Sequence, residues 1–178
     1  NVFARCLGLP RRLVPAARRL AEGEQRTALV DLGTLDDRPF TYMAGIGFTA
    51  SMSASADAAP ERKAAFGQLH FAGVAAREIG ARYLRRPPRM HLSTAGREAT
   101  GITVVAQNSH ALTYFGPKAI TTSSGAGLQT GTLSLALLER ARPLDVAGVV
   151  GRLVAGRDLG AHRAVVRVES ATSAVIES

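Results

Sequence analysis

Two glycines one residue apart, Gly45 and Gly47, constrain the fold of this 178-residue chain more than any other feature of its sequence. They follow an apolar stretch, residues 39–43, that has the composition of a strand, and a small, polar stretch comes after them. Because glycine lacks a Cβ, it lets the backbone turn sharply and approach another group closely. A bulge or a tight turn explains the pair on backbone grounds, whereas a functional interpretation needs a phosphate, a lipid or another strand beside it. Both interpretations stay open at this point.

Composition limits the classes of partner. The chain carries 22 basic and 14 acidic side chains, for a net charge of +8, and every basic residue except Lys63 and Lys118 is an arginine. This excess favours anionic partners such as nucleotide phosphates or an anionic membrane surface, although a GC-rich genome also enriches a protein in arginine and alanine. Aromatic and basic residues are not interleaved, so no nucleic-acid partner is expected. Cys6 is the only cysteine, so no disulfide can form within the chain, which fits a reducing compartment. No apolar run is long enough to cross a bilayer.

Hydrophobic periodicity predicts an α+β chain. The predicted helices cover residues 1–8, 11–21, 60–85 and 144–154, and the predicted strands cover residues 25–32, 39–46, 89–93, 101–107, 132–138, 164–169 and 174–176. Residues 51–59 are predicted as a loop or a frayed helix, residues 114–117 as a loop, and residues 121–127 as a loop that lines a site. Many strands with two or three inserted helices indicate a mainly antiparallel β-sandwich as the base of the fold.

Six stretches, taken in order, resemble motifs of one family. They are Asn-Val-Phe-Ala-Arg-Cys-Leu-Gly-Leu-Pro at 1–10, Val-Asp-Leu-Gly at 30–33, Ala-Gly-Ile-Gly-Phe-Thr-Ala at 44–50, the basic segment and Gly-Gln-Leu at 62–69, Val-Ala-Gln-Asn-Ser with Tyr-Phe-Gly at 105–116, and residues 125–137. The family is that of the bacterial diacylglycerol kinases and related lipid kinases, which includes the sphingosine and ceramide kinases. The resemblance covers nearly the whole chain.

The resemblance implies the second lobe of a two-lobed kinase with the general fold of NAD kinase. Residues 1–24 would be the end of the N-terminal nucleotide-binding lobe or linking helices, and residues 25–178 the C-terminal β-sandwich lobe. The family's Gly-Gly-Asp-Gly-Thr nucleotide loop is not found in the sequence, and its Asp-Gly-Glu motif, which holds the expected general base, would lie beyond residue 178. We therefore expect no catalytic residue in this chain and an inactive fragment.

Candidate binding residues fall into two groups. Asn1, Arg62 and Lys63 are the candidates for the nucleotide side; a helix cap and a solvated helix start are the competing explanations. The candidates for the lipid side are five residues of the glycine-rich turn and of the stretches after residue 105: Gly45, Gly47, Thr49, Asn108 and Tyr114.

Three residues depart from the family's pattern. Thr49 stands where many relatives have Asp, and Gln129 and Thr130 stand where relatives have an Asp-Asp pair. A neutral residue at 49 weakens any case for recognition of an amine, and a hard divalent cation has little reason to bind at 129–131 without carboxylates. ATP and Mg²⁺ are implied for the full-length enzyme, and no metal is expected in this chain.

The leading hypothesis is a cytoplasmic, peripheral ATP-dependent lipid kinase that phosphorylates a diacylglycerol-like or sphingoid hydroxyl at the membrane surface. Its other partners would be the missing N-terminal lobe and, through an open sheet edge, a second copy of the chain. The alternative is a lipid- or membrane-binding domain that kept the fold and lost the chemistry, a hypothesis motivated by Thr49, Gln129 and Thr130. NAD kinase itself is a third possibility that lacks the Val-Asp-Leu-Gly and Gln-Asn-Ser motifs.

Overall fold

A four-stranded antiparallel sheet forms the centre of the molecule. The computed structural model describes residues 2–23, 27–61, 68–83, 87–140 and 142–178. The sheet has the order β10–β9–β6–β3, with bounds β3 Met43–Gly47, β6 Thr103–Gln107, β9 Leu133–Leu138 and β10 Val165–Ala171. The inner strands β6 and β9 are buried along most of their length, in agreement with their nearly continuous apolar sequences.

A second, three-stranded sheet covers one face of the first. Its order is β11–β4–β5, with bounds β4 Met90–Thr94, β5 Arg97–Gly101 and β11 Val175–Glu177. Side chains from both sheets make one core of six buried residues, which are Leu92, Val104, Ala106, Leu135, Leu137 and Ala171. The two sheets form the antiparallel sandwich that the sequence predicts, so the α+β assignment is confirmed.

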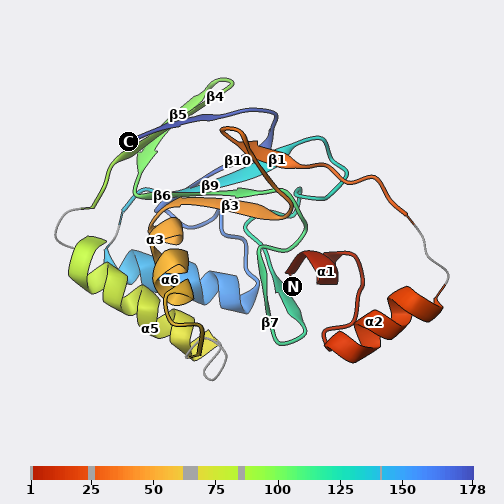
Figure 1. Cartoon of the computed structure of the whole chain (residues 1–178). Helices are drawn as coiled ribbons and strands as arrows, with labels where there is room; N and C mark the ends of the chain where they lie inside the picture. The colour runs from red at the N-terminus through yellow and green to blue at the C-terminus, as the bar shows by residue number, and fades with distance from the viewer. Residues whose placement is uncertain (1, 24–26, 62–67, 84–86, 141) are drawn as a thin grey trace.

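Helices cover the opposite face of the central sheet (Figure 1). They are α3 Phe48–Asp57, α5 Gln68–Glu78 with a π-helical continuation η1 Ile79–Tyr83, and α6 Pro143–Ala155. The rings of Phe48 and Tyr83 meet edge to face with their centroids 5.0 Å apart and thereby join the start of α3 to the end of η1. Helix α6 confirms the helix predicted over residues 144–154. It begins at a proline, carries Asp145 in its first turn and is followed by Gly156 at φ +65°.

Two hairpins and two N-terminal helices complete the chain. The hairpins are β1 Gly33–Leu35 with β2 Arg38–Phe40, and β7 Thr113–Phe115 with β8 Lys118–Ile120; the helices are α1 Val2–Cys6 and α2 Leu13–Glu22. Helix α1 lies beside β7, whereas α2 stands apart from both sheets (Figure 1). The helices in the described parts of the chain are all too short or too polar to cross a lipid bilayer.

Near the glycine pair one sequence-based prediction is wrong, and another that was left open is decided. The predicted strand 25–32 forms no strand over residues 27–32, because this segment bonds to a loop instead of a strand: Asp31 N–H donates to the Leu128 carbonyl over 2.7 Å. For residues 51–59 a loop or a frayed helix was predicted, and the helical alternative is the one observed, since residues 51–57 are the greater part of α3. Its small residues permit close packing on α5, where Ser55 Oγ donates to Glu78 Oε1 over 2.9 Å.

Two further predictions missed strands. The predicted loop 114–117 is the tip of the β7–β8 hairpin, whose turn contains Gly116 at φ +58°. Strand β5 was not predicted because its sequence, Arg-Glu-Ala-Thr-Gly, lacks an apolar alternation. It forms because β4 pairs with it along five residues through a turn at 95–96, where Gly96 has φ +80°.

Candidate functional site

The glycine turn, defined as residues 45–49, joins the end of β3 to the start of α3. Gly47 has φ +78°, and a Cβ there would lie 2.3 Å from Met90 Cε and 2.5 Å from the Ile102 carbonyl oxygen. A Cβ at Gly45 would lie 2.5 Å from Thr49 Cγ2. Local packing therefore requires both glycines, and the turn needs no bound ligand to explain them.

Thr103 on β6 holds the glycine turn in place. Its hydroxyl donates to the Ile46 carbonyl over 2.7 Å. Because a hydroxyl has one hydrogen, Thr103 Oγ1 must accept from Thr49, both from the Thr49 hydroxyl over 2.9 Å and from the Thr49 N–H over 3.3 Å. Thr103 therefore caps the first turn of α3 from outside the helix, and the Thr49 oxygen is left as an acceptor only.

Replacing Thr103 with valine keeps the shape of the side chain and removes all three hydrogen bonds. We expect Thr103→Val to lower the free energy of unfolding by about 1–3 kcal/mol, because the first turn of α3 loses its cap and the half-buried Ile46 carbonyl loses its donor. Urea denaturation measures the difference. Thr100→Val is the matched control: Thr100 is exposed and bonds only to His91 Nδ1, over 3.1 Å, so a change below about 0.5 kcal/mol is expected. Equal losses in the two variants would contradict the capping role.

Asn108 lies at the other end of the β3–β6 ladder. Gly47 pairs with Thr103 at one end of that ladder and Met43 with Gln107 at the other. The Asn108 side chain is buried and its Nδ2 donates to the Asp31 carbonyl over 2.8 Å and to the Thr41 carbonyl over 3.1 Å. Asn108 thus ties two segments to β6, and the structure does not bring it together with the glycine turn.

Tyr114 lies in a third place, where β7 meets α1. The Arg5 guanidinium stacks 3.5 Å from the centroid of the Tyr114 ring and donates to the Gly116 carbonyl over 3.1 Å. The Tyr114 hydroxyl lies 3.2 Å from His110 Nε2 and 3.8 Å from Cys6 Sγ. Sequence reasoning did not single out Arg5, Cys6 or His110, because only the docking of α1 on the hairpin brings them to Tyr114.

This environment favours the neutral phenol. Burial raises the pKa of Tyr114, the hydrogen bond and charge interaction with Cys6 raise it further, and Arg5 lowers it. The pKa of Tyr114 in the folded chain is therefore above the ordinary value of 10.0. The folded state loses stability as the pH rises past the raised pKa, because the phenolate is less favourable in the folded chain than in the unfolded one. Subtracting the phenolate absorbance of Tyr114→Phe from that of the wild-type chain isolates Tyr114. We expect a midpoint above 10 that falls in Cys6→Ala; an unchanged midpoint in that variant would contradict the role of Cys6.

The loop at 121–125 is organised by a buried polar network. Gln107 Nε2 donates to the Ser109 carbonyl over 2.6 Å and to Thr121 Oγ1 over 2.9 Å, and Gln107 Oε1 accepts from the N–H and hydroxyl of Thr122 over 3.0 and 2.6 Å. Ser134 Oγ donates to Ser123 Oγ over 3.1 Å. No buried side-chain nitrogen or oxygen among the described residues lacks a partner. The loop was predicted to line a site, and its small hydroxyl residues serve this network.

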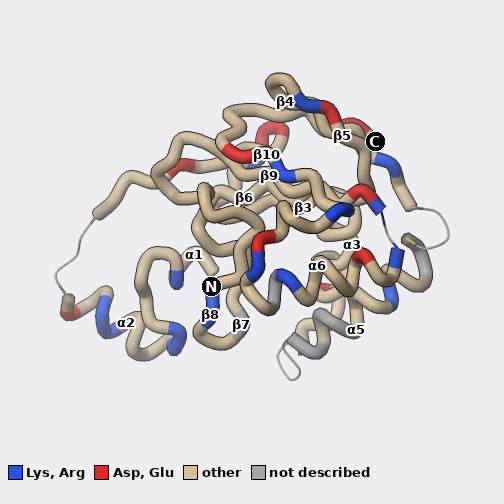
Figure 2. Tube along the Cα trace, turned by 180° about the vertical axis from the view of Figure 1, so that it is seen from behind, with Lys and Arg blue, Asp and Glu red and all other residues tan. Residues whose placement is uncertain are grey.

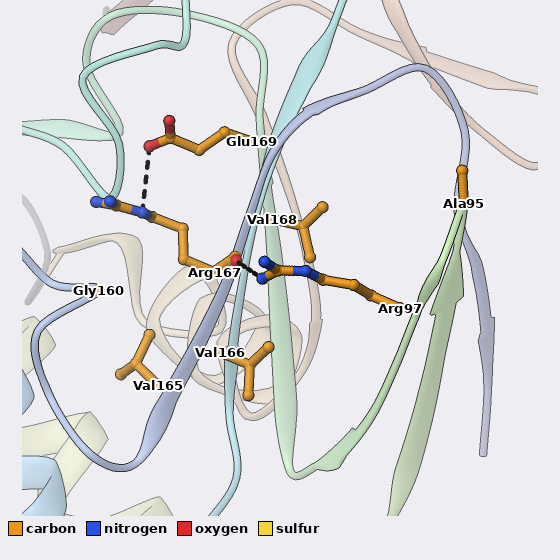
Figure 3. A pocket seen from close by; sticks show the side chains of 8 residues that line it. All are labelled: Ala95, Arg97, Gly160, Val165, Val166, Arg167, Val168 and Glu169. Carbon is orange, nitrogen blue, oxygen red and sulfur yellow. Dashed lines mark hydrogen bonds and ion pairs between the residues drawn. The ribbon is translucent and has the colours of Figure 1, made fainter.

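The network reaches the surface at Glu169, on the rim of a groove along the outer edge of β10 (Figure 3). Ser123 Oγ donates to Glu169 Oε1 over 2.9 Å. The groove has a volume of about 640 Å³ and is lined by β10 together with Ala95, Arg97 and Gly160.

The two arginines of this groove are engaged within the protein. Arg167 forms ion pairs with Glu169, over 3.1 Å, and with Asp158. Arg97 reaches across from β5 and donates to the Arg167 carbonyl over 3.1 Å, and the register of β10 against β9 shifts between Val168 and Ala171. A charged side chain at the edge of a sheet and a shifted register both hinder pairing with a further strand. Because both arginines already have partners within the protein, we interpret the groove as a protected sheet edge and not as an anion-binding site.

The loop at 129–131 does not fit magnesium. Gln129 Nε2 donates to the Leu29 carbonyl over 2.8 Å, and Gly131 N–H donates to Asp31 Oδ2 over 2.7 Å. Asp31 supplies the only carboxylate in these contacts, whereas Mg²⁺ in proteins is held by carboxylates together with water and phosphate oxygens. Across the described part of the chain, no three His, Cys, Asp or Glu side chains group closely enough to hold a metal ion. The nucleotide-side candidates Asn1, Arg62 and Lys63 lie outside the described residues.

Comparison with known proteins gives a match in fold. No protein-family model and no curated protein matches the sequence. Three solved structures from Bacillus anthracis str. Sterne match 99% of the chain. Two are described as "a putative diacylglycerol kinase" and one as a diacylglycerol kinase, with TM-scores of 0.67, 0.63 and 0.60 and identities of 21%, 19% and 19%. The chain spans about half the length of these structures, 54–55% of each. The fold that the resemblance implies is thereby confirmed.

Proposed function

We propose that this chain is the acceptor-side lobe of an ATP-dependent lipid kinase, which transfers phosphate to a hydroxyl of a diacylglycerol-like or sphingoid lipid. The observation that carries the proposal is the match in fold over 99% of the chain to structures described as diacylglycerol kinases. The ordered motifs of the sequence, from residues 1–10 to 125–137, support the same assignment without reference to the fold.

The chain would contribute binding groups and not the base. Phosphoryl transfer needs cations around the phosphates and a carboxylate that accepts the hydroxyl proton. In this proposal Asn1, Arg62 and Lys63 face the nucleotide, the glycine turn and Tyr114 lie on the lipid side, and the base and the nucleotide loop belong to the rest of a longer protein. We place ATP and Mg²⁺ with the nucleotide loop of that longer protein.

Thr49 favours a neutral acceptor lipid within this proposal. Its hydroxyl hydrogen is given to Thr103, so its oxygen can only accept a hydrogen bond, and it carries no charge to pair with an ammonium group. Gly45, Gly47 and Thr49 lie together, whereas Asn108 is used inside the fold. We therefore propose that Asn108 stabilises the lobe and does not contact the lipid.

A lipid-binding lobe without kinase activity is the second candidate. Thr49 and Gln129 favour it, because both stand where the family has acids. Thr49 bonds to Thr103, and Gln129 bonds to the Leu29 carbonyl. These contacts stabilise the lobe without offering a charge to a substrate.

A phosphorylation assay separates the two candidates. Full-length protein is incubated with labelled ATP and vesicles that contain diacylglycerol, monoacylglycerol, ceramide or sphingosine, and we expect label in one neutral lipid. Arg62→Ala with Lys63→Ala is expected to raise the KM for ATP about tenfold, the effect of one lost charge-assisted contact of about 1.4 kcal/mol. Arg77→Ala, on the exposed side of α5, is the control and leaves KM unchanged. Absence of label from every lipid would reject the kinase and favour the second candidate.

A further inference from the structure

The loop at 127–132 lies where the resemblance implies an acidic pair that could hold a divalent cation, but its own sequence carries no charge. Gly-Leu-Gln-Thr-Gly-Thr offers only amide, hydroxyl and backbone groups, whereas hard divalent cations are held by carboxylates together with carbonyl and water oxygens. The acidic residues of the described chain are spread over many separate elements (Figure 2), and among the described side chains no group of three His, Cys, Asp or Glu could hold a metal ion. The loop therefore needs a support other than a cation.

Asp31 supplies this support with both its backbone and its side chain. Its N–H donates to the Leu128 carbonyl over 2.7 Å, and its Oδ2 accepts from the Gly131 N–H over 2.7 Å. Its carbonyl accepts from Asn108 Nδ2 over 2.8 Å, and Asn108 is buried directly after the end of β6. One residue thus binds the loop at two points and is itself fixed to the central sheet. We call these three contacts the Asp31 clasp.

Two further residues hold the same loop without a charge. Gln129 Nε2 donates to the Leu29 carbonyl over 2.8 Å, so the segment before β1 is bound at a second residue. The Thr130 hydroxyl lies 3.1 Å from the carbonyls of Gly127 and Thr132, and with its one hydrogen it donates to either. These two donors occupy the positions of the acidic pair. An ionised acid at either position could only accept, and it would repel the carbonyl unless a cation lay between them.

We propose that the Asp31 clasp and the donors at 129 and 130 take the place of a structural cation, so that the fold of this lobe does not depend on Mg²⁺. A cation in such a loop joins oxygen atoms of separate segments, whereas here N–H and O–H donors bind the oxygen atoms directly. The bond from Gly131 N–H to the Asp31 carboxylate is charge-assisted and therefore stronger than a neutral hydrogen bond. The inference goes beyond the proposed function, because Mg²⁺ that accompanies ATP in phosphoryl transfer is a separate ion.

The clasp also competes with any cation for the carboxylate of Asp31. An ion at Asp31 Oδ2 would have to displace the Gly131 N–H, and it would gain one charged ligand beside neutral oxygens. Mg²⁺ gives up its bound water reluctantly, so one carboxylate that is already in use offers it little. We therefore expect neither Mg²⁺ nor Ca²⁺ to bind this loop tightly enough to stabilise the lobe.

Thermal unfolding of the chain with and without divalent cations tests the proposal independently of kinase activity. The midpoint Tm is measured in excess EDTA, in millimolar Mg²⁺ and in millimolar Ca²⁺, and we expect the three values to agree within about 1 °C. A structural cation at a hundred times its Kd would raise Tm by about 5–10 °C in a chain of this length. A rise of that size in the wild-type chain would overturn the proposal.

Substitution of Asp31 tests the clasp itself. Asp31→Ala should lower Tm by about 4–8 °C, the effect of a lost hydrogen bond to a charged group, and should speed amide hydrogen exchange at Gly131. Asp31→Asn keeps an acceptor oxygen and should recover about half of the loss. The matched control is Asp37→Ala, an exposed acid in the β1–β2 turn, with a change below about 2 °C. Equal changes at positions 31 and 37 would overturn the proposal.

Gln129→Asp with Thr130→Asp tests whether the two donors replace an ion. The new carboxylates would share the loop with Asp31 and repel it, so we expect a Tm below that of the wild type in EDTA, which Mg²⁺ raises by about 5–10 °C. The control pair, Thr172→Asp with Ser173→Asp, adds the same charge at two exposed residues before β11 and should not respond to Mg²⁺. The proposal is overturned if the loop pair does not respond to Mg²⁺, or if both pairs respond equally.

Discussion

Gly47→Ala lowers the free energy of unfolding by about 2–4 kcal/mol, the sum of about 1 kcal/mol for a side chain at positive φ and about 1–3 kcal/mol for overpacking. The positive φ is +78°, and the new methyl group would meet both Met90 Cε and the Ile102 carbonyl oxygen. The methionine can rotate away, but the carbonyl belongs to the backbone between β5 and β6, so the turn itself must move. Urea denaturation of the wild-type and variant chains measures the loss as a shift of the midpoint.

Gly96→Ala separates the two contributions. Gly96 has φ +80°, almost the value at Gly47, and a Cβ there meets no atom within 4 Å. Its substitution should therefore cost only the conformational part, about 1 kcal/mol. If the two variants lose the same stability, the crowding at Met90 and Ile102 has no energetic consequence, and close packing does not explain why position 47 is a glycine.

Gln107→Met is expected to cost more, about 3–5 kcal/mol. The methionine has nearly the same volume, but the N–H and hydroxyl of Thr122 lose their acceptor and the Ser109 carbonyl loses its donor in a fully buried site. Each buried polar group left without a partner costs about 1–3 kcal/mol. The loop at 121–125 should also loosen, which amide hydrogen exchange at Thr122 and Ser123 would detect as faster exchange.

Gln129→Met is the matched control for this network. Gln129 is exposed and its side chain donates one hydrogen bond, to the Leu29 carbonyl over 2.8 Å. Water can replace that bond, so we expect a loss below about 1 kcal/mol and no change in exchange at Thr122. A loss at position 107 as small as that at 129 would show that water enters the network and that burial does not determine its energy.

The sequence predicted those parts of the fold that follow from local pattern. The apolar runs of β6 and β9, and the amphipathic pattern of α6 with a glycine after it, led to the observed elements. The glycine pair indicated a turn with close backbone contacts. For α3 a loop and a frayed helix stayed open, because small, polar residues resemble a loop when their partner helix is unknown. Strand β5 was missed because its polar residues are held by pairing with β4 and not by their own apolar pattern.

The contacts around the candidate sites could not be predicted, because they depend on residues far apart in the chain. Thr103 caps a helix that begins at Phe48, although α5, η1, β4 and β5 lie between them in the chain. Arg5 donates to a carbonyl 111 residues away. The spacing of residues along the chain does not indicate such contacts. Asn108 is a related case: its place in a family motif predicted a binding role, and the structure adds that its amide donates to two backbone segments, which the motif did not indicate.

The order of strands in the central sheet also bears on how the chain folds. β1–β2, β4–β5 and β7–β8 are hairpins that can close locally, but each pair in the sheet β10–β9–β6–β3 joins strands with other elements between them. The bond from Gly131 N–H to Asp31 spans 100 residues. Pairing over such distances must overcome the entropy of closing long loops and is slow. During synthesis, β3 would therefore leave the ribosome well before β6 and β9 exist to pair with it, and the hairpins would form while this strand still waits for its partner.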